Sequence, residues 1–551
     1  MKLLTLRKIG ILLLLFQVSS CDKEDIDPEN LIQEEAVKNH IERLASDEFL
    51  GRKPGTTGED RTVQYIAEEL KKSGIKSGNV NSYFQDFKIQ KVDYIKGSDL
   101  HIFAENSQRE YKFGSDYYAT TSYKLNEIVS IENVDMVYVG FGITAPRFKW
   151  DDYKNVDVTG KVVVVLDNDP GYYSGDDSMF RGKKPSFYGS LKYKKREAAK
   201  RGAVGLILVH DKAISQDDIN KIKKDAPIFI EGNPDLASDR LKFSGLITNK
   251  VMENLVNLSN LKIDYVKAAQ KKNFSVLPLK TKASLSVESK SKDFIKTKNV
   301  VGFLKGSRRP DEYIIYTAHW DHIGTRGSHL GKDSIFNGAI DNASGTAMQL
   351  EVAKAFSQLN NRPERSLIFL FTSAEEMGLL GAEHYANNPI YPLNKTAAVI
   401  NADASFAVER MRMVVNVIQG YTSLDSLVDV AAEKLGRGIY KSDGNSPPNN
   451  VFMRSDHYPF VKKGVPAVWN VGNFDPMNGD AEEEKKIGEF VSKHYHKVTD
   501  EFYDNFNAAN IAFDAQLNFL TGLYLGNSDL WPNWNKDLEY RAIRDKSRLE
   551  N

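Results

Sequence analysis

The strongest constraint on the fold is a regular alternation of apolar strands and helices from Asn299 onward. This pattern favours a mostly parallel sheet with helices on both faces. We therefore predict an α/β fold in which a mixed, mostly parallel sheet lies between helices. The predicted strands are 313–318, 367–372, 397–402, 413–418 and 465–471, and the predicted helices are 345–359, 379–387, 423–435 and 506–525.

The segment before this alternation predicts an interrupted domain. Apolar residues at helical spacing between 36 and 74 indicate two helices, and alternating aromatic segments follow from 83 to 123. From about 130 to 290 the chain carries apolar strands, a basic helix and a lysine-rich return. The predicted organisation is a main domain (36–125 and 292–525), an inserted α/β domain (126–291) and a C-terminal strap (526–551) that packs Trp531 and Trp534 on the domain surface.

The charge balance excludes one class of partner. The 551 residues include 74 basic and 74 acidic side chains, so the formal net charge is zero. A neutral chain gives no electrostatic reason to expect binding to nucleic acid or to an anionic membrane surface. We therefore predict no nucleic-acid partner.

The N-terminus predicts export. Basic residues, a short apolar run and small residues precede Cys21, the only cysteine of the chain, so no disulfide can form within it. The sequence VSSC resembles a bacterial lipoprotein signal, which implies a signal peptide (1–20), a lipidated Cys21 and a polar tether (21–35). The alternative is an ordinary cleaved signal with an incidental cysteine. The predicted location is the outer membrane, on its periplasmic side or at the cell surface, with membrane contact only through the lipid.

Histidine and carboxylate residues follow the predicted strands. In open α/β sheets, ligands bind at the carboxyl ends of the strands, so these side chains should meet at one edge. Mixed imidazole and carboxylate ligation is typical of zinc. The candidates in chain order are His319, Asp321, His322, Asp341, Glu375, Glu376, Asp403, His494 and His496.

Each candidate also has an ordinary explanation. A histidine after a strand is commonly a hydrogen-bonded or surface residue, a strand-end aspartate commonly caps a helix, and adjacent glutamates commonly face solvent. The adjacent carboxylates of Glu375 and Glu376 follow a core strand and would repel one another unless a cation compensates them. Convergence of so many candidates on one sheet edge favours a shared site.

These motifs resemble the co-catalytic zinc aminopeptidases of peptidase family M28. The resemblance is carried by TAHWDHIG, NGAIDNASGTAMQLEVAKAF, LFTSAEEMGLLGAEHYA, INADAS, RSDHYPF and YHKVTDEF, and upstream by LASDEFLGRKPGTTGEDR. It covers about 36–125 and 297–525. The insert, with GKVVVVLD and AAKRGAVGLILVHD, is similar to a protease-associated (PA) domain.

The resemblance implies a role for each matching residue. Two Zn²⁺ ions would be bound, with Glu375 as the general base that acts on a metal-bridging water. Asp321 would orient His319, and the Asp341–Asn342 peptide bond would be cis. The implied metal ligands are Asp341 as the bridge, His319 and Asp403 at one ion, and Glu376 and His496 at the other.

Four further residues are candidates around the substrate. Tyr495 is either a donor to the oxyanion or a packing aromatic. Arg454, Asp456 and His457 are predicted to form a wall of the specificity pocket, and the alternative is that Ser455 or Asp456 caps a helix. His322 and His494 match no ligand position of the family and are expected behind the ligands or at the surface.

The predicted function is an exported zinc aminopeptidase that removes N-terminal residues from peptides. A carboxypeptidase of the same fold is an alternative because Arg326, Arg410, Arg412 and Arg454 lie in loops that could hold a terminal carboxylate. A glutaminyl cyclase, which uses one zinc, and an inactive binding protein are disfavoured because the five-ligand set is complete. The insert could instead be a docking module for peptides or polysaccharide, although its residues show no chemical site.

Overall fold

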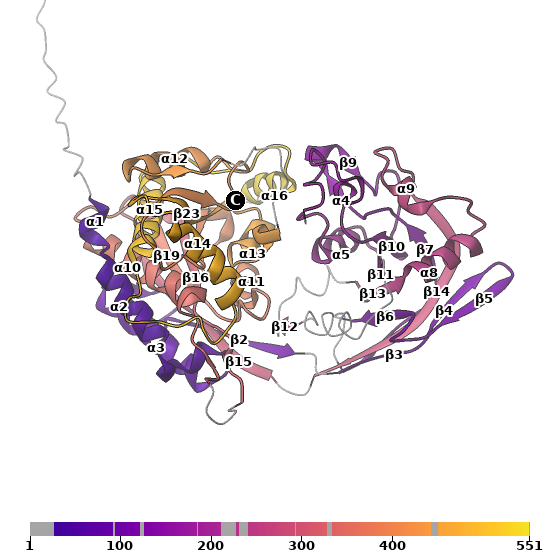
Figure 1. The fold of residues 1–551 in the computed structure, drawn as a ribbon, viewed down its shortest axis with the longest axis horizontal. Coiled ribbons are helices and arrows are strands. Elements are labelled where there is room, and N and C mark those ends of the chain that lie inside the picture. The colour runs from indigo at the N-terminus through magenta and orange to yellow at the C-terminus, as the bar shows by residue number, and fades with distance from the viewer. Residues whose placement is uncertain are drawn as a thin grey trace, which may run out of the picture.

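The chain forms two α/β units that lie side by side (Figure 1). The structure is a computed structural model. It describes residues 27–91, 94–121, 126–184, 186–210, 228–230, 241–291, 294–327, 333–441 and 450–549. The signal peptide and Cys21 lie outside these ranges. Within them, no helix combines the length and the apolar character needed to span a membrane.

The first unit is built on a ten-stranded sheet that is parallel at its centre. The order is β12-β2-β15-β19-β16-β20-β23-β21-β22, with β1 beside β15. β19, β16, β20 and β23 run parallel. β15 pairs antiparallel with β19 and β2, and β21 pairs antiparallel with β23 and parallel with β22. The bounds are β1 Lys76–Ser77, β2 Phe84–Lys91, β12 Ile228–Ile230, β15 Phe294–Leu304, β16 Arg309–His319, β19 Arg365–Thr372, β20 Thr396–Asn401, β21 Met411–Asn416, β22 Gly438–Ile439 and β23 Ala467–Pro476.

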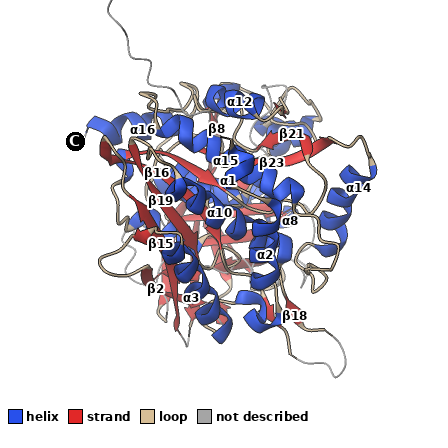
Figure 2. Cartoon of the chain, turned by 90° about the vertical axis from the view of Figure 1, so that its left-hand side faces the viewer, coloured by secondary structure: helices blue, strands red, loops and turns tan. Residues whose placement is uncertain are grey.

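Helices cover both faces of this sheet (Figure 2). On one face α10 and α15 bury most of their residues against the strands, polar side chains such as Gln349 and Asn518 included. On the other face α11 and α13 pack on a second apolar cluster. The bounds are α1 Pro28–Leu31, α2 Glu34–Leu44, α3 Thr57–Lys72, α10 Gly345–Gln358, α11 Leu380–Asn387, α12 Asp425–Lys434, α13 His457–Lys462, α14 Glu482–Glu489, α15 Ala509–Gly526 and α16 Glu539–Leu549.

The second unit has its own nine-stranded sheet, in the order β5-β4-β14-β7-β10-β11-β13-β6 with β3 beside β14. β7, β10, β11 and β13 run parallel and the remaining pairs are antiparallel. The bounds are β3 Tyr94–Gly97, β4 Leu100–Ala104, β5 Ser107–Tyr111, β6 Tyr117–Thr120, β7 Ile128–Tyr138, β8 Thr144–Ala145, β9 Trp150–Asp151, β10 Val162–Leu166, α4 Pro170–Ser174, α5 Leu191–Lys200, β11 Gly205–His210, β13 Phe243–Thr248, α8 Asn249–Leu258, α9 Tyr265–Ala269 and β14 Leu277–Lys290.

The predicted mixed α/β fold class is confirmed, but the sheets divide the chain differently from the predicted boundary at residue 126. Strands β3 to β6, between residues 94 and 120, pair within the second sheet. Their alternating pattern predicted strands correctly and carried no information about which sheet they join. In the other direction, β12 leaves the second unit and pairs with β2 at the edge of the first sheet.

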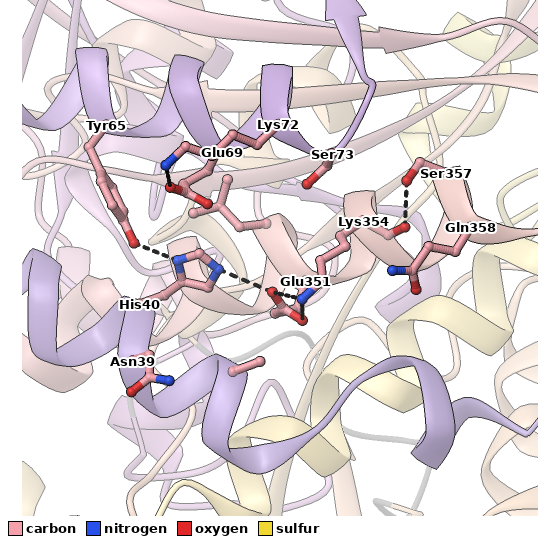
Figure 3. Close-up of a pocket in the computed structure, with 12 residues that line it drawn as sticks. Asn39, His40, Tyr65, Glu69, Lys72, Ser73, Glu351, Lys354, Ser357 and Gln358 are labelled. Carbon is pink, nitrogen blue, oxygen red and sulfur yellow. Dashed lines mark hydrogen bonds and ion pairs between the residues drawn. The ribbon is translucent and has the colours of Figure 1, made fainter.

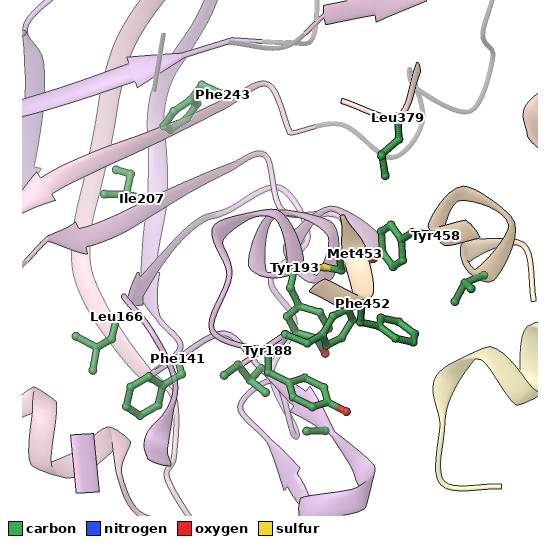
Figure 4. Close-up of a cluster of buried hydrophobic side chains, with 14 of the residues drawn as sticks. Phe141, Leu166, Tyr188, Tyr193, Ile207, Phe243, Leu379, Phe452, Met453 and Tyr458 are labelled. Atoms are coloured by element: carbon green, nitrogen blue, oxygen red, sulfur yellow. The ribbon is translucent and has the colours of Figure 1, made fainter. Parts of the chain in front are cut away.

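The two units meet through aromatic side chains (Figure 4). The Phe187 ring of the second unit lies edge-on to Phe452 of the first, with 5.7 Å between ring centroids. The Arg196 guanidinium on α5 donates a hydrogen bond of 2.7 Å to the Tyr458 hydroxyl on α13. Arg196 also pairs at 2.5 Å with Glu539 on α16, so the C-terminal segment contacts both units. Trp534, in the C-terminal segment, is buried, and Trp531 is half-buried.

A cavity of 620 Å³ lies on the first unit between α2, α3 and α10 (Figure 3). The His40 ring bridges the Tyr65 hydroxyl, at 2.6 Å, and the Glu351 carboxylate, at 3.1 Å. Lys354 pairs with the same carboxylate at 3.0 Å. His40, Tyr65, Glu351 and Lys354 therefore satisfy one another's polar groups within this cavity.

Candidate metal centre

The carboxyl ends of neighbouring strands bring one histidine and two aspartates together. His319 is the last residue of β16, Asp403 follows β20, and Asp341 lies in the turn before α10. The Nε2 atom of His319 is 3.4 Å from Asp341 Oδ1 and 3.4 Å from Asp403 Oδ1. All three residues are buried, so these polar groups need a partner that the apolar core cannot provide.

A second group forms around the other oxygen of Asp341. The Nε2 atom of His496 is 3.1 Å from Asp341 Oδ2 and 3.0 Å from Glu376 Oε2. His322, which the sequence analysis left outside the ligand set, places its Nδ1 atom 2.7 Å from Glu376 Oε1. His322 is buried, and its Nε2 atom has no hydrogen-bond partner in the structure.

The donor set fits zinc, and Asp341 belongs to both groups. Ligand atoms of His319, Asp341 and Asp403 lie within 4.8 Å of one another, and those of His322, Asp341 and Glu376 do the same. Imidazole nitrogens with carboxylate oxygens are the ligands that zinc takes in catalytic sites. The two oxygens of Asp341 face different groups, which is the arrangement a bridging carboxylate requires. All five implied ligands are therefore close together.

Backbone contacts fix the bridging residue. The Asp500 carboxylate accepts hydrogen bonds from the backbone N–H groups of Ile340 and Asp341, at 2.9 and 3.1 Å. The Asn342 side chain donates to the Ala402 carbonyl and accepts from the Gly345 N–H. The Asp341–Asn342 peptide bond is cis, as the resemblance implied. Sequence reasoning did not single out Asp500, although it lies in the quoted motif YHKVTDEF.

Asp321 contacts His319 through its main chain. The Asp321 carbonyl oxygen is 3.1 Å from His319 Nδ1, whereas its carboxylate oxygen Oδ1 is 3.8 Å away. That carboxylate instead accepts a hydrogen bond of 3.0 Å from the Glu375 N–H. Asp321 therefore positions both the His319 ring and the Glu375 backbone. Burial raises the pKa of Asp321 to about 8 in the metal-free protein.

The adjacent glutamates have opposite electrostatic environments. Burial raises the pKa of Glu375, and the charges of Glu376 and Asp403 raise it further despite the opposing effect of His319. Burial also acts to raise the pKa of Glu376, but hydrogen bonds from His322 and His496 outweigh it, so that pKa lies below its usual value. Two carboxylates whose pKa values are pushed apart are suited to different roles.

The residues predicted to surround the substrate separate into two kinds. Arg454 is exposed and donates a hydrogen bond of 3.2 Å to the Tyr495 hydroxyl. The Tyr495 ring stacks on His496 with 3.9 Å between centroids. Asp456 and His457 are buried instead: Asp456 accepts from the Thr372 hydroxyl at 2.5 Å, and His457 donates to the Phe452 carbonyl at 2.9 Å. These two residues fix the segment that presents Arg454.

Arg52 is a buried residue near the centre that the sequence analysis did not identify. Its guanidinium donates to the backbone carbonyls of Leu44, Trp320, Asn337 and Gly338, at 2.5 to 2.9 Å. It thereby joins the end of α2 to the segments that carry His319 and Asp341. The only sequence signal was its place in the quoted motif FLGRKPG.

Comparison with known proteins agrees with this site. Residues 299–518 match the family model described as peptidase family M28. We call residues 299–518 the M28 domain after this match. The matched range contains every implied metal ligand and Glu375, and it covers less than half of the chain.

Curated relatives of the M28 domain have more than one activity. Aminopeptidase NAALADL1 of Mus musculus is 37% identical over 112 residues, which are 19% of this chain and 13% of the relative. Glutamate carboxypeptidase 2 homolog of Caenorhabditis briggsae is 30% identical over 226 residues, 36% of this chain and 26% of the relative. Leupeptin-inactivating enzyme 1 of Streptomyces exfoliatus is 32% identical over 184 residues, 32% of this chain and 39% of the relative. The matches thus span well under half of each relative.

Solved structures similar to the chain include two aminopeptidases. The aminopeptidase from Aneurinibacillus sp. strain AM-1 is 18% identical with a TM-score of 0.43, over 90% of this chain and 95% of its own. BSAP, a zinc aminopeptidase from Bacillus subtilis, is 16% identical with a TM-score of 0.43, over 92% of this chain and 99% of its own.

Proposed function

We propose that the protein is a zinc-dependent aminopeptidase that removes N-terminal residues from peptides. The observation that carries this proposal is the pair of histidine–carboxylate groups that share Asp341, with Glu375 directly beside Glu376. The ligands of one ion would be His319, Asp341 and Asp403, and those of the other Asp341, Glu376 and His496. When bound, the zinc ions would supply Lewis acidity towards the scissile carbonyl and the attacking water.

Glu375 would carry the proton in this reaction. Its raised pKa allows it to accept a proton from the attacking water and to return it to the leaving amine. The hydrogen bond from its backbone N–H to the Asp321 carboxylate fixes the position of the Glu375 backbone, from which the side chain extends. The Tyr495 hydroxyl accepts from Arg454, so its own proton remains available to an oxyanion.

Aminopeptidase activity is favoured over carboxypeptidase activity by the arginines. Arg410 pairs with Glu29 at 2.5 Å and Arg412 with Asp475 at 3.0 Å. Arg326 lies over the Phe336 ring. Of the four, Arg454 contacts the neighbour of a proposed ligand, through the Tyr495 hydroxyl beside His496. One arginine is not the cluster that the carboxypeptidase alternative requires.

A panel of substrates tests this proposal. Aminoacyl chromogenic amides and their N-acetylated counterparts are assayed with a protein that starts after Cys21, before and after chelation and zinc readdition. We expect cleavage of the free-amine substrates alone, loss on chelation and recovery with zinc. Equal cleavage of the blocked substrates would contradict aminopeptidase activity, and absence of bound zinc would contradict the ligand assignment.

We also propose that the protein is exported as an outer-membrane lipoprotein and that its insert is a PA-like domain. The support for export is the position of Cys21 after an apolar run, and the support for the PA-like insert is the pair of motifs quoted above. Mass spectrometry of the mature N-terminus would show a lipidated Cys21. An unmodified N-terminus at another residue would contradict export as a lipoprotein.

A further inference from the structure

Residues 452–458 of the M28 domain connect the ends of two strands that lead into the metal centre. The Asp456 carboxylate accepts a hydrogen bond of 2.5 Å from the hydroxyl of Thr372, the last residue of β19. The Ser455 hydroxyl accepts one of 2.7 Å from the side-chain amide of Asn401, the last residue of β20. Each strand is followed within three residues by a side chain of the proposed site. The segment is therefore attached to the backbone that carries the centre.

The same segment carries Arg454. Its guanidinium donates a hydrogen bond of 3.2 Å to the Tyr495 hydroxyl, and the Tyr495 ring stacks on the proposed ligand His496. A displacement of the segment would move this guanidinium away from the hydroxyl that we propose as the donor to the oxyanion.

Arg196 of the insert contacts both ends of the segment. Its guanidinium donates to the Tyr458 hydroxyl at 2.7 Å. It also lies over the Phe187 ring, 5.7 Å from the centroid, and Phe187 in turn lies edge-on to Phe452. Phe187, Phe452 and Tyr458 are buried. The insert therefore packs on the segment through one guanidinium and one aromatic ring.

The orientation of the Arg196 guanidinium is fixed from two sides. One terminal nitrogen donates to Tyr458, and the other pairs with Glu539 on α16 at 2.5 Å. The guanidinium is planar and its donors form a rigid fork, so occupation of both nitrogens determines how the group lies. This rigidity makes Arg196 suited to hold a neighbouring segment in one position.

We propose that Arg196 is a positioning residue, which holds residues 452–458 so that Arg454 stays in contact with the Tyr495 hydroxyl. This inference rests on the proposed peptidase function, and it gives the insert a part in the reaction without contact to the substrate. The oxyanion forms only on the way to the transition state, so loss of this positioning should lower kcat and leave KM nearly unchanged.

Steady-state kinetics of zinc-loaded variants make the first test. We expect Arg196→Ala to lower kcat by about 10- to 100-fold, the scale of a small misplacement at an active site, with its zinc retained. Lys200→Met is the matched control, because it removes the neighbouring cation of α5 that pairs with Glu539 at 3.1 Å. It should keep the wild-type kcat. An equal loss of kcat in both variants would overturn the inference.

An Arg454→Met background distinguishes positioning from a general loss of folded protein. If Arg196 acts through Arg454, Arg196→Ala should have little further effect on kcat in that background. A variant that is merely less folded would lose the same factor in both backgrounds, and that result would overturn the inference.

Hydrogen exchange tests the positioning without hydrolysis. The N–H groups of Arg454 and Tyr458 donate to carbonyls of the same stretch at 2.9 and 3.0 Å, so their exchange reports its order. Peptides that cover 452–458 should exchange faster in Arg196→Ala than in wild type or Lys200→Met, while those that cover 313–319 should not. Unchanged exchange at 452–458 would overturn the inference whether or not peptides are cleaved. A wild type that cleaves no peptide would instead contradict the proposed function.

Discussion

Glu375 and Glu376 differ in the contacts of their carboxylates, and this difference predicts different variant phenotypes. Glu376 lies within 3.0 Å of two histidines, whereas Glu375 contacts Asp321 only through its backbone N–H. We expect Glu375→Gln to lower kcat by about 10²- to 10⁴-fold, the usual contribution of a general base, with two zinc ions retained. Glu376→Gln should instead lose zinc. Activity assays with elemental analysis check both, and near-normal activity of Glu375→Gln would remove it from the mechanism.

His496 and His322 compete for the role of zinc ligand beside Glu376. We assign His496 because its Nε2 atom is within 3.1 Å of both Asp341 and Glu376. His322 makes such a close contact with Glu376 only, although its ring is also within ligand range of Asp341. His496→Ala should therefore abolish binding of one zinc ion. His322→Ala should weaken zinc affinity by about 10- to 100-fold, as expected for a residue that supports a ligand. Competition with a chelator measures both affinities, and the reverse ranking would make His322 the ligand.

His384 on α11 predicts a pH dependence of stability. Its ring stacks on Phe87, and burial lowers its pKa from 6.5 to about 4. The unfolded chain binds the proton more readily, so the stability contributed by neutral His384 is present above pH 6.5 and is lost as the pH falls towards 4. The loss amounts to about 3 kcal/mol at most. Chemical denaturation of wild type and His384→Gln between pH 7 and 4 should show a smaller decline in the variant. Parallel declines would refute this.

At the scale of elements, Arg52 joins the end of α2 to the turns around His319 and Asp341. Burial lowers its pKa to about 10, so the guanidinium stays charged at neutral pH and its hydrogen bonds to four carbonyls persist. Arg52→Met leaves those buried carbonyls without donors, and we expect a loss of about 2–5 kcal/mol in the free energy of unfolding. Arg61→Met, at an exposed arginine on α3, is the matched control. Equal stability of the two variants would show that other groups satisfy the carbonyls.

The strands and helices of the M28 domain were predictable because their hydrophobic periodicity is strong. β16, β19 and β20 lie within a few residues of the predicted ranges, and the strand-end rule placed His319 and Asp403 at one edge. The assignment of β3 to β6 to a sheet was not predictable, since alternation fixes the buried face of a strand and leaves its partner open. Arg52 and Asp500 were missed because they act on backbone atoms that are distant in sequence.

At the scale of the whole molecule, the C-terminal helix α16 connects the M28 domain to the insert. The Glu539 carboxylate on α16 forms ion pairs with Arg196 at 2.5 Å and with Lys200 at 3.1 Å, both on α5. Burial acts to raise the pKa of Glu539, but these two cations outweigh it and keep the carboxylate ionised at neutral pH. Arg196 also donates to Tyr458, so α5, α13 and α16 meet at one guanidinium.

A double-mutant cycle tests whether this contact makes the two units unfold together. Arg196→Ala and Glu539→Ala should each separate unfolding of the insert from that of the M28 domain in calorimetry, because each removes an ion-pair partner from a half-buried charge at the contact between the units. The coupling energy between them should be about 1–3 kcal/mol, as for residues in one ion-pair network. Lys485→Ala with Glu482→Ala, an exposed pair on α14, should show a coupling energy below about 1 kcal/mol. Coupling of Arg196 with Glu539 as weak as that of the exposed pair would mean that other contacts, among them that of Phe187 with Phe452, hold the units together.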